Sequence, residues 1–471
     1  MFCSVLANAG TSWFNRTFRN MADLPTIAAL ATPSGSSALA VIRVSGKSAL
    51  PIAKEAFGKR EIEPRKAYFG AYRAISGKVL DECLWVSFSG PKSYTGEDLL
   101  EISCHGNPFI VNRIIEDLFK RGCRPALPGE FTRRAFINGR MDLTQAEAVA
   151  EIISARSERA FEAARKLLSG ELGKRIFEWN DEILKLIAET ETQIDFSEEE
   201  VPEIDSGYFK GRLESLILKL RKTRETARYS SRVYEGINVV IFGAPNAGKS
   251  SLMNALVGTE RALVSDEAGT TRDFISENIL IGENCIRIID TAGIREYTES
   301  KVEESGILKT YDCMKGADFL IFVVDSSSPA PALSGEILES INRENSCILF
   351  NKTDLNPAFD KDAFLPGIDR LSVSLLDSRA SETVKRYLED IFSKKNIVPD
   401  SEVLVVSARH AEAIMAAENS LIDASNLIGN IPIEFISSKL RSAMEELSEI
   451  LGQFDNEKVL DKVFSSFCIG K

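Results

Sequence analysis

A glycine-rich run near the middle of the chain has the composition of a phosphate-binding loop. Residues Gly243 to Ser250 read Gly-Ala-Pro-Asn-Ala-Gly-Lys-Ser, which fits the P-loop pattern. Glycines let backbone N–H groups close around phosphates, and a helix that begins here adds positive potential. Lys249 would reach the β- and γ-phosphates, and the Ser250 hydroxyl would ligate Mg²⁺. This run alone is compatible with either ATP or GTP.

Three further motifs, in the order that GTPases require, favour guanine. Asp290-Thr-Ala-Gly293 offers a carboxylate near Mg²⁺ and a glycine amide near the γ-phosphate. Thr271, in the run Gly269 to Asp273, is the natural second hydroxyl ligand of the metal. Asn351-Lys-Thr-Asp354 supplies a carboxylate that accepts from N1–H and the 2-amino group of guanine. Adenine has neither donor, so a site built on this hydrogen bond selects against it.

Two positions indicate how hydrolysis is assisted. Ras-like GTPases carry glutamine after the Asp-x-x-Gly run to orient the attacking water. This chain has Ile294 there, so another group must orient the water. The amide oxygen of Asn246 could hold a monovalent cation beside the phosphates, in the role of an arginine finger. The alternative is that Asn246 only shapes the loop, and its position alone does not decide between the two.

These motifs lie in a segment whose pattern predicts a parallel sheet. From Ile237 onward, short apolar runs alternate with helical patterns, which indicates βαβ units. The predicted strands are Ile237–Phe242, Ile286–Ile289, Phe319–Val324 and Cys347–Phe350.

The flanking segments predict two other architectures. Residues 26–124 read as α+β, with strands at Ala38–Val44 and Leu84–Phe88 and a helix over Pro108–Arg121. Helices are expected from 142 to 232, the first opened by a capping box at Thr144 and Glu147. Their apolar series run over residues 149–167, 172–190 and 209–233, and the helical pattern returns after 395.

Together these patterns predict a multidomain α/β and α+β protein. Its expected parts are residues 21–140 as an α+β domain, 141–236 and 396–471 as two parts of one all-α domain, and 237–395 as an inserted Ras-like P-loop domain. Residues 1–20 are interpreted as an extension or as a start misassigned ahead of Met21, with a transit peptide as the alternative.

Composition limits the classes of partner. The net charge of −12 argues against a surface that coats nucleic acid, so RNA contact needs a local basic patch or a partner protein. No apolar run approaches the roughly 20 residues that span a bilayer. Eight cysteines without a CxxC pair, and only two histidines, disfavour a disulfide framework and a zinc site. We therefore expect a cytoplasmic protein, in a reducing compartment and without membrane contact. We also expect His105 to have a structural role.

The chain resembles the MnmE (TrmE) family of tRNA-modification GTPases. The resemblance rests on the P-loop with Asn246, on Gly269–Asp273 and Asp290–Glu296, and above all on the ending Ser465–Lys471. It implies that the N-terminal domain binds 5-formyltetrahydrofolate or a related folate and mediates homodimerisation. The implied folate-binding positions are Arg43, Glu101, Arg140 and Lys471. Arg43 alone would also fit an ordinary surface residue.

The resemblance also implies a potassium-dependent GTPase site. K⁺ would be held by Asn246, Ser265, Glu267 and Thr270, and Mg²⁺ by Ser250 and Thr271. The catalytic water would be positioned by Glu303, although the preceding loop is one residue longer than usual and leaves Glu304 open. The full set of expected GTP contacts is Asn246, Ala247, Gly248, Lys249, Ser250, Ser251, Ser265, Asp266, Glu267, Ala268, Gly269, Thr270, Thr271, Asp290, Thr291, Ala292, Gly293, Asn351, Lys352, Asp354, Ser372, Val373 and Ser374.

Two features near the end of the chain are interpreted through the same family. Ser372-Val-Ser374 corresponds to the last guanine-contacting segment, with Ser407-Ala-Arg409 as an alternative that lies beyond the final helix of the domain. Cys468, four residues from the end, does not fit a prenylation box because glycine and lysine follow it. The resemblance implies a catalytic thiol near the folate pocket.

The expected function is therefore a potassium-stimulated GTPase that acts in tRNA modification. With the FAD-carrying flavoprotein MnmG, in a heterotetramer, it would modify C5 of the wobble uridine in certain tRNAs. The alternative is an Era-like ribosome-assembly switch, which would need a KH domain with a basic GXXG loop. The matching tetrad, Gly170–Gly173, contains Glu171, which would repel phosphate.

Overall fold

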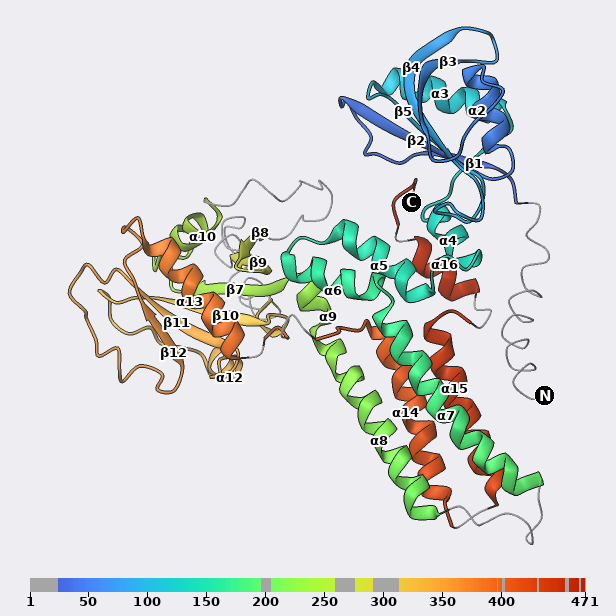
Figure 1. Cartoon of the computed structure of the whole chain (residues 1–471). Helices are drawn as coiled ribbons and strands as arrows, with labels where there is room; N and C mark the ends of the chain where they lie inside the picture. Colours follow the sequence, from blue (N-terminus) through green and yellow to red (C-terminus); the bar gives the residue numbers. More distant parts are fainter. Residues whose placement is uncertain are drawn as a thin grey trace, which may run out of the picture. The chain divides into compact units, whose positions relative to one another are not determined.

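The computed structural model describes residues 24–195, 205–258, 276–290, 313–395, 397–399, 403–429, 432–453, 457–465 and 467–470 (Figure 1). The chain divides into two compact units, which we describe separately. Unit 1 comprises Met1–Ala150, Leu168–Glu178 and Leu447–Lys471, and unit 2 comprises Glu151–Leu167 and Trp179–Glu446. Within the described ranges, every helix is too short or too polar to cross a membrane.

Unit 1 contains a six-stranded sheet in the order β3-β4-β5-β2-β1-β6, antiparallel except where β6 pairs with β1. One face of the sheet packs against α2 and α3 in one apolar cluster. On the other face, Ile27, Ala29 and Leu99 join a smaller buried cluster with Phe131. Because side chains alternate along a strand, Ile42 and Val44 enter the core while Arg43 lies on the other face. The elements are β1 (Ile27–Leu30), β2 (Leu39–Ser45), α2 (Ala49–Phe57), β3 (Ala67–Arg73), β4 (Val79–Phe88), β5 (Leu99–His105), α3 (Pro108–Lys120), β6 (Arg124–Pro125), α4 (Glu130–Ile137) and α16 (Glu457–Ser465).

Unit 2 contains a second six-stranded sheet, in the order β12-β11-β10-β7-β9-β8. All of its pairings are parallel except that between β8 and β9, as the alternating pattern predicted. The four strands predicted here are confirmed to within two residues at each end. The elements are β7 (Ile237–Gly243), α10 (Lys249–Val257), β8 (Ser276–Ile281), β9 (Asn284–Asp290), β10 (Phe319–Asp325), α12 (Gly335–Ser340), β11 (Ser346–Asn351), β12 (Asp369–Ser372) and α13 (Ala380–Lys394).

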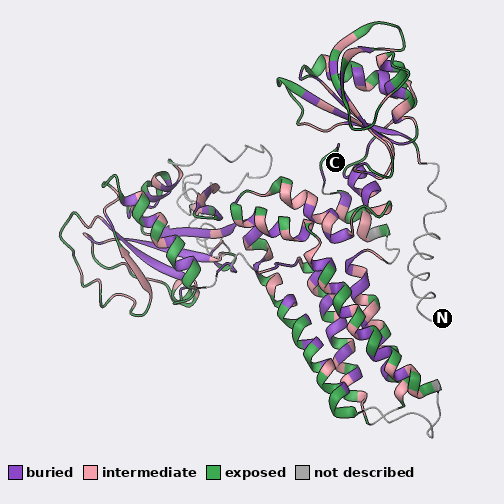
Figure 2. Cartoon of the chain, in the orientation of Figure 1, coloured by how far each residue is buried: buried purple, intermediate pink, exposed green. Residues whose placement is uncertain are grey.

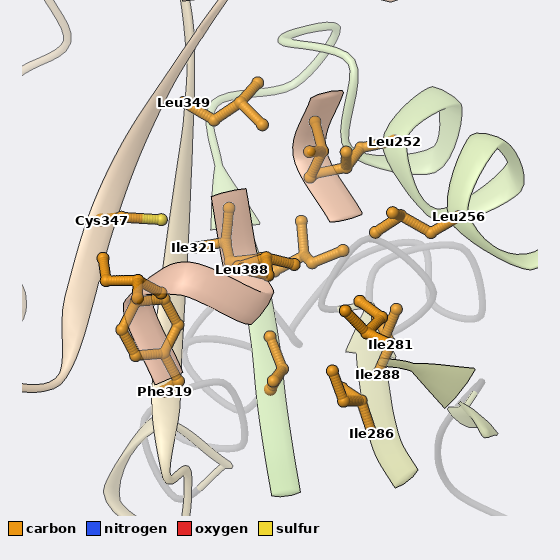
Figure 3. Packing of buried hydrophobic residues seen from close by; sticks show 14 of the residues in the cluster. Leu252, Leu256, Ile281, Ile286, Ile288, Phe319, Ile321, Cys347, Leu349 and Leu388 are labelled. Atoms are coloured by element: carbon orange, nitrogen blue, oxygen red, sulfur yellow. The ribbon is translucent and has the colours of Figure 1, made fainter. Parts of the chain in front are cut away.

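Strand β10 shows why this sheet needs cover on both faces. Phe319, Ile321 and Val323 join one apolar cluster with α10 and α13, whereas the alternate residues of the strand join a second cluster on the opposite face. Figure 3 shows Phe319 and Ile321 with Leu252, Leu256 and Leu388 in the first cluster. Each such side chain contributes roughly 1.5–3 kcal/mol by leaving water. The central strands are accordingly buried along their length (Figure 2).

The other described elements of unit 2 are helices. Arginine or lysine pairs with a carboxylate between α7 and α8, α8 and α14, α14 and α15, and α15 and α7, so these four helices form a bundle (Figure 1). The helices are α5 (Leu143–Ser154), α6 (Glu158–Leu168), α7 (Glu171–Asp195), α8 (Ser206–Arg224), η2 (Glu225–Tyr229), α9 (Ser230–Tyr234), α14 (Ala408–Leu427) and α15 (Ile433–Ile450), of which α5, α6, α7 and α15 contribute residues to both units.

The start of α5 differs from the capping box predicted at Thr144 and Glu147. The Asp142 carboxylate accepts a hydrogen bond from the Gln145 backbone N–H at 2.9 Å, and the Gln145 side-chain oxygen accepts one from the Asp142 N–H at 3.0 Å. This reciprocal pair is the actual capping box. The Thr144 hydroxyl is buried and donates to Asp142 at 2.6 Å, so it supports the cap rather than forming it. The predicted capping residues were therefore wrong.

We expect Asp142→Ala to lower the stability of the first turn of α5 by about 1 kcal/mol, because it removes the acceptor for the Gln145 N–H. Hydrogen exchange at Gln145 measures this directly, as protection should fall about fivefold. Glu147→Ala, at the position first predicted, should leave exchange at Gln145 unchanged. A larger effect from Glu147→Ala than from Asp142→Ala would contradict the assignment.

The apolar series expected over residues 149–167 is divided between two helices. Helix α5 ends at Ser154 and α6 begins at Glu158. The Ser157 hydroxyl accepts from the Ala160 N–H at 3.1 Å, which caps the start of α6. Ile153, counted in the apolar series, is 46% exposed. The second series, residues 172–190, is confirmed as one buried stripe of α7.

Candidate functional site

The predicted P-loop connects the end of β7 to the start of α10. Gly243, Asn246 and Gly248 have positive φ angles of 148°, 60° and 106°, and such left-handed residues form concave turns of backbone N–H groups. Lys249 is buried, and its ammonium group donates to the carbonyls of Gly243 at 3.0 Å and Ala244 at 2.9 Å. Ser250 and Ser251 are exposed in the first turn of α10.

Asn351 joins the P-loop to the predicted guanine motif. It is buried at the end of β11, and its side-chain amide donates to the Ala247 carbonyl at 2.8 Å. Its side-chain oxygen accepts from the Leu375 N–H at 3.1 Å. One side chain therefore holds together the phosphate loop, residues 351–354 and the segment after β12.

Of the two segments considered for the last base contact, the structure brings residues 372–374 to the guanine motif. Val373 donates from its N–H to the Phe350 carbonyl at 2.9 Å, and its own carbonyl accepts from the Thr353 N–H at 3.4 Å. Residues 407–409 lie instead at the start of α14, where the Ser407 hydroxyl accepts from the His410 N–H at 3.3 Å.

Within the guanine motif, Lys352 and Asp354 lie in different environments. Asp354 is exposed in the turn that follows β11. Lys352 has a positive φ of 58°, and its ammonium group lies 2.7 Å from Oδ2 of Asp325, at the end of β10. Asp325 was not among the predicted site residues, although it directly follows a predicted strand at the edge of the sheet where such sites form.

The predicted folate-binding residues Arg43 and Glu101 are paired across neighbouring strands. They are register partners on β2 and β5, and the Arg43 Nε lies 2.8 Å from the Glu101 carboxylate. Both side chains are about one quarter exposed, at 27% and 29%. The Arg43 guanidinium also lies 5.8 Å from the centre of the Tyr94 ring. The structure thus places a partly exposed cation, anion and aromatic ring together.

Arg140, the third predicted folate-binding residue, is connected to the same region through Gly96. A Cβ on Gly96 would lie 3.4 Å from Cγ of Arg140 and 2.7 Å from Cβ of Asn138. The Asn138 amide donates to the Thr95 carbonyl at 2.7 Å, which fixes this approach. Arg140 therefore packs against the segment that carries Tyr94.

The end of the chain lies against the same sheet. The Cys468 carbonyl accepts from the Gly129 N–H at 3.4 Å, and Ile469 forms a bridge with Pro128. A Cβ on Gly470 would lie 2.1 Å from the Leu30 carbonyl oxygen. Leu30 follows Ala29, the register partner of Arg43, so the tail reaches the strands that carry the Arg43–Glu101 pair.

Cys468 differs from most other described cysteines in its exposure. Cys468 is exposed and Cys313 is intermediate, whereas the remaining described cysteines are buried. Burial raises the pKa of Cys83 to about 12 and that of Cys104 to about 11, so both remain thiols. His105 was predicted to be structural. Its ring Nδ1 forms a hydrogen bond with the Asp81 carboxylate at 2.8 Å.

Other predicted residues are described only by their backbone or lie outside the described ranges. Asp290 ends β9, but only its backbone position is described. The predicted residues that lie outside the described ranges are Ser265, Asp266, Glu267, Ala268, Gly269, Thr270, Thr271, Thr291, Ala292, Gly293, Glu303, Glu304 and Lys471.

Two family models match the chain. Residues 143–468 match the model described as MnmE helical domain. Residues 26–140 match the model described as GTP-binding protein TrmE N-terminus.

Similar proteins extend over nearly the whole chain. A tRNA modification GTPase MnmE of Opitutus terrae is 44% identical over 454 residues, covering 95% of this chain and 99% of that protein. Proteins of the same name are 40% identical in Aquifex aeolicus, covering 94% of this chain, and 38% identical in Alkaliphilus metalliredigens, covering 95%; each match covers 99% of the relative.

Proposed function

The chain belongs to the MnmE family of tRNA modification GTPases, and from this membership we propose a specific reaction. We propose that the protein is a potassium-stimulated GTP hydrolase. It acts with the flavoprotein MnmG to add a carboxymethylaminomethyl or aminomethyl group at C5 of the wobble uridine, position 34, of certain tRNAs. The carbon unit comes from a folate.

The observation that most supports GTP as the nucleotide is the double hydrogen bond of Asn351. It couples the phosphate loop at Ala247 to the base loop at Leu375, so phosphate and base are bound by one connected structure. Asp354 is exposed beside it and is free to accept from the two donors of guanine. An adenine base would leave this carboxylate without those donors.

The described part of the P-loop fits the two cations of the proposal. The Ser250 hydroxyl, in the first turn of α10, would ligate Mg²⁺ together with Thr271. Asn246, with its left-handed backbone and exposed amide, would contribute to a K⁺ site with Ser265, Glu267 and Thr270. Bound Mg²⁺ would neutralise phosphate charge, and Glu303 would position the attacking water.

The chemistry of the Arg43 region fits a folate. The pterin ring has an amino edge that a carboxylate such as Glu101 can bind, and the glutamate tail carries carboxylates that suit Arg43, Arg140 and Lys471. Cys468 lies on the tail that reaches the same sheet and is proposed as the catalytic thiol. MnmG would supply FAD, in a heterotetramer built on a homodimer of this chain. Because the net charge is −12, we expect MnmG to contribute to tRNA binding.

Mass spectrometry of tRNA nucleosides tests this reaction. In cells that lack the protein, the 5-aminomethyl-type wobble uridines should be lost, and wild type should restore them. Cys468→Ser should fail to restore them while GTP hydrolysis by the purified variant is kept. Cys313→Ser, a control at the other described cysteine with solvent access, should restore them. An unchanged nucleoside profile in the deletion strain would refute the modification reaction. GTP hydrolysis by this chain would then have to serve another process.

A further inference from the structure

Asp325 is a carboxylate at the nucleotide site that neither the motifs nor the family resemblance identified. It ends β10 directly beside Asn351, its register partner at the end of β11. Its Oδ2 lies 2.7 Å from the Lys352 ammonium group and accepts from the Ser328 hydroxyl at 3.1 Å. Its Oδ1 accepts from the Ser327 N–H at 2.9 Å and the Ser327 hydroxyl at 2.6 Å. The carboxylate is thus fixed from both sides, and only 15% of its side chain is exposed.

The segment that carries Asp325 is also tied to the backbone of the guanine motif. Ser326 donates from its N–H to the Asn351 carbonyl at 3.1 Å and donates from its hydroxyl to the same oxygen. The Ser326 carbonyl accepts from the Ala358 N–H at 2.8 Å, on the far side of the motif. Residues 325–328 therefore form a rigid support beneath residues 351–358.

Lys352 is the member of the guanine motif that gains most from such support. Its φ of 58° is a left-handed conformation, which is unfavourable for a lysine. Its long side chain would lose rotamer entropy on binding if it were fixed only when the base binds. The contact with Asp325 fixes the end of that side chain before any nucleotide arrives.

Burial and hydrogen bonds act in opposite directions on the Asp325 carboxyl. Burial raises its pKa, but hydrogen bonds from Lys352, Ser327 and Ser328 outweigh burial and lower the pKa to about 2. Asp325 is therefore ionised at every pH at which the protein would bind nucleotide. The ion pair with Lys352 acts as a permanent constraint rather than a pH switch.

We propose that Asp325 is a positioning residue for guanine recognition: it holds Lys352 so that residues 351–354 are already arranged to receive the base. This inference rests on the proposed GTP-binding function. Asp325 touches Lys352 rather than the nucleotide, so it contributes to affinity by preorganising the motif.

Asp325→Asn tests the inference, because it keeps the shape of the side chain and removes its charge. We expect the Kd for both GTP and GDP to rise about tenfold, since both share the base. KM for GTP should rise by the same factor with kcat unchanged within about twofold, as expected when ground-state and transition-state binding fall equally. The preference for GTP over ITP, which lacks the 2-amino group, should also decrease because Asp354 is less well placed.

A double-mutant cycle separates positioning from general damage to the fold. In a Lys352→Met background, Asp325→Asn should cause no further loss of affinity, because the partner through which it acts is gone. Asp362→Asn is the matched control. Asp362 lies in the loop after the guanine motif and pairs with Arg370 at 3.2 Å, but its side chain is 98% exposed. It should leave the Kd unchanged.

Three outcomes would overturn the inference: an unchanged Kd in Asp325→Asn, an equal change in Asp362→Asn, or an undiminished effect of Asp325→Asn in the Lys352→Met background. If Asp325→Asn does not fold, Ser328→Ala, which removes one donor to Oδ2, should give a smaller loss in the same direction. If Ser328→Ala has no effect there, the inference fails. If the wild-type chain does not bind GTP, the proposed function is refuted. If the wild-type chain binds GTP and Asp325→Asn binds it with the same Kd, only this inference is refuted.

Discussion

Gly248→Ala is expected to abolish GTP binding and, with it, hydrolysis. Gly248 has a φ of 106°, which an L side chain rarely adopts. The added Cβ would lie 2.2 Å from the amide nitrogen of Asn351, far closer than two such atoms can approach. That amide donates to the Ala247 carbonyl, so Asn351 would have to leave the contact that joins the phosphate loop to the base loop. We expect affinity to fall by at least about 100-fold.

Titration with a fluorescent guanine nucleotide measures this effect. Gly335→Ala is the control in the same sheet domain, because Gly335 has no heavy atom within 4 Å of an added Cβ. The control should bind nucleotide like wild type. Binding by Gly248→Ala within about threefold of wild type would mean that the close approach between the two loops is not required.

The parallel sheet and its loops could be predicted from the sequence because the signals are local. The apolar runs that became β7, β10 and β11 are buried on both faces, and such strands are read from composition alone. The P-loop and the guanine motif follow two of these strands directly, so their common edge of the sheet could also be predicted.

Contacts that depend on register between distant segments could not be predicted. Lys352 finds Asp325 because β10 and β11 are aligned so that Asp325 pairs with Asn351. Arg43 and Glu101 were each expected at the site from the family resemblance, but their contact follows from the antiparallel register of β2 and β5. The spacing of these residues along the sequence does not indicate the register of either strand pair.

The start of α5 shows a different kind of failure, in which two local signals compete. Thr144 and Glu147 fit the capping pattern, as do Asp142 and Gln145. The structure selects the second pair because Thr144 is fully buried, which removes its hydroxyl from the capping position. Burial is a tertiary property, so the sequence pattern alone could not decide.

Gly470→Ala is expected to eliminate most tRNA modification while GTP hydrolysis remains. Gly470 has a φ of 96°, and an added Cβ would lie 2.1 Å from the Leu30 carbonyl oxygen and 3.0 Å from Cα of Ala31. Both of those atoms belong to backbone, which cannot move aside as a flexible side chain would. The tail would therefore have to leave the sheet, and Ile469 would lose its bridge to Pro128.

Displacement of the tail should act on modification through two residues. Cys468, the proposed catalytic thiol, lies two positions before Gly470, and Lys471, a proposed folate ligand, follows it. We expect modified wobble uridines to fall by at least about tenfold and folate binding to weaken, both of which can be measured on the full chain. Gly70→Ala, on β3 of the same sheet with open space around its Cβ, is the control and should retain both activities.

The two readouts of Gly470→Ala separate the roles of the tail. If folate binding and modification are both lost while GTP hydrolysis continues, the position of the tail on the sheet is needed for the folate chemistry and not for the nucleotide cycle. If modification is lost but folate still binds, Cys468 is the group that needs placement and Lys471 contributes little to affinity. Retention of both would mean that the approach of Gly470 to Leu30 has no part in the reaction, and the catalytic role proposed for Cys468 would then have to be exerted away from the Arg43–Glu101 pair.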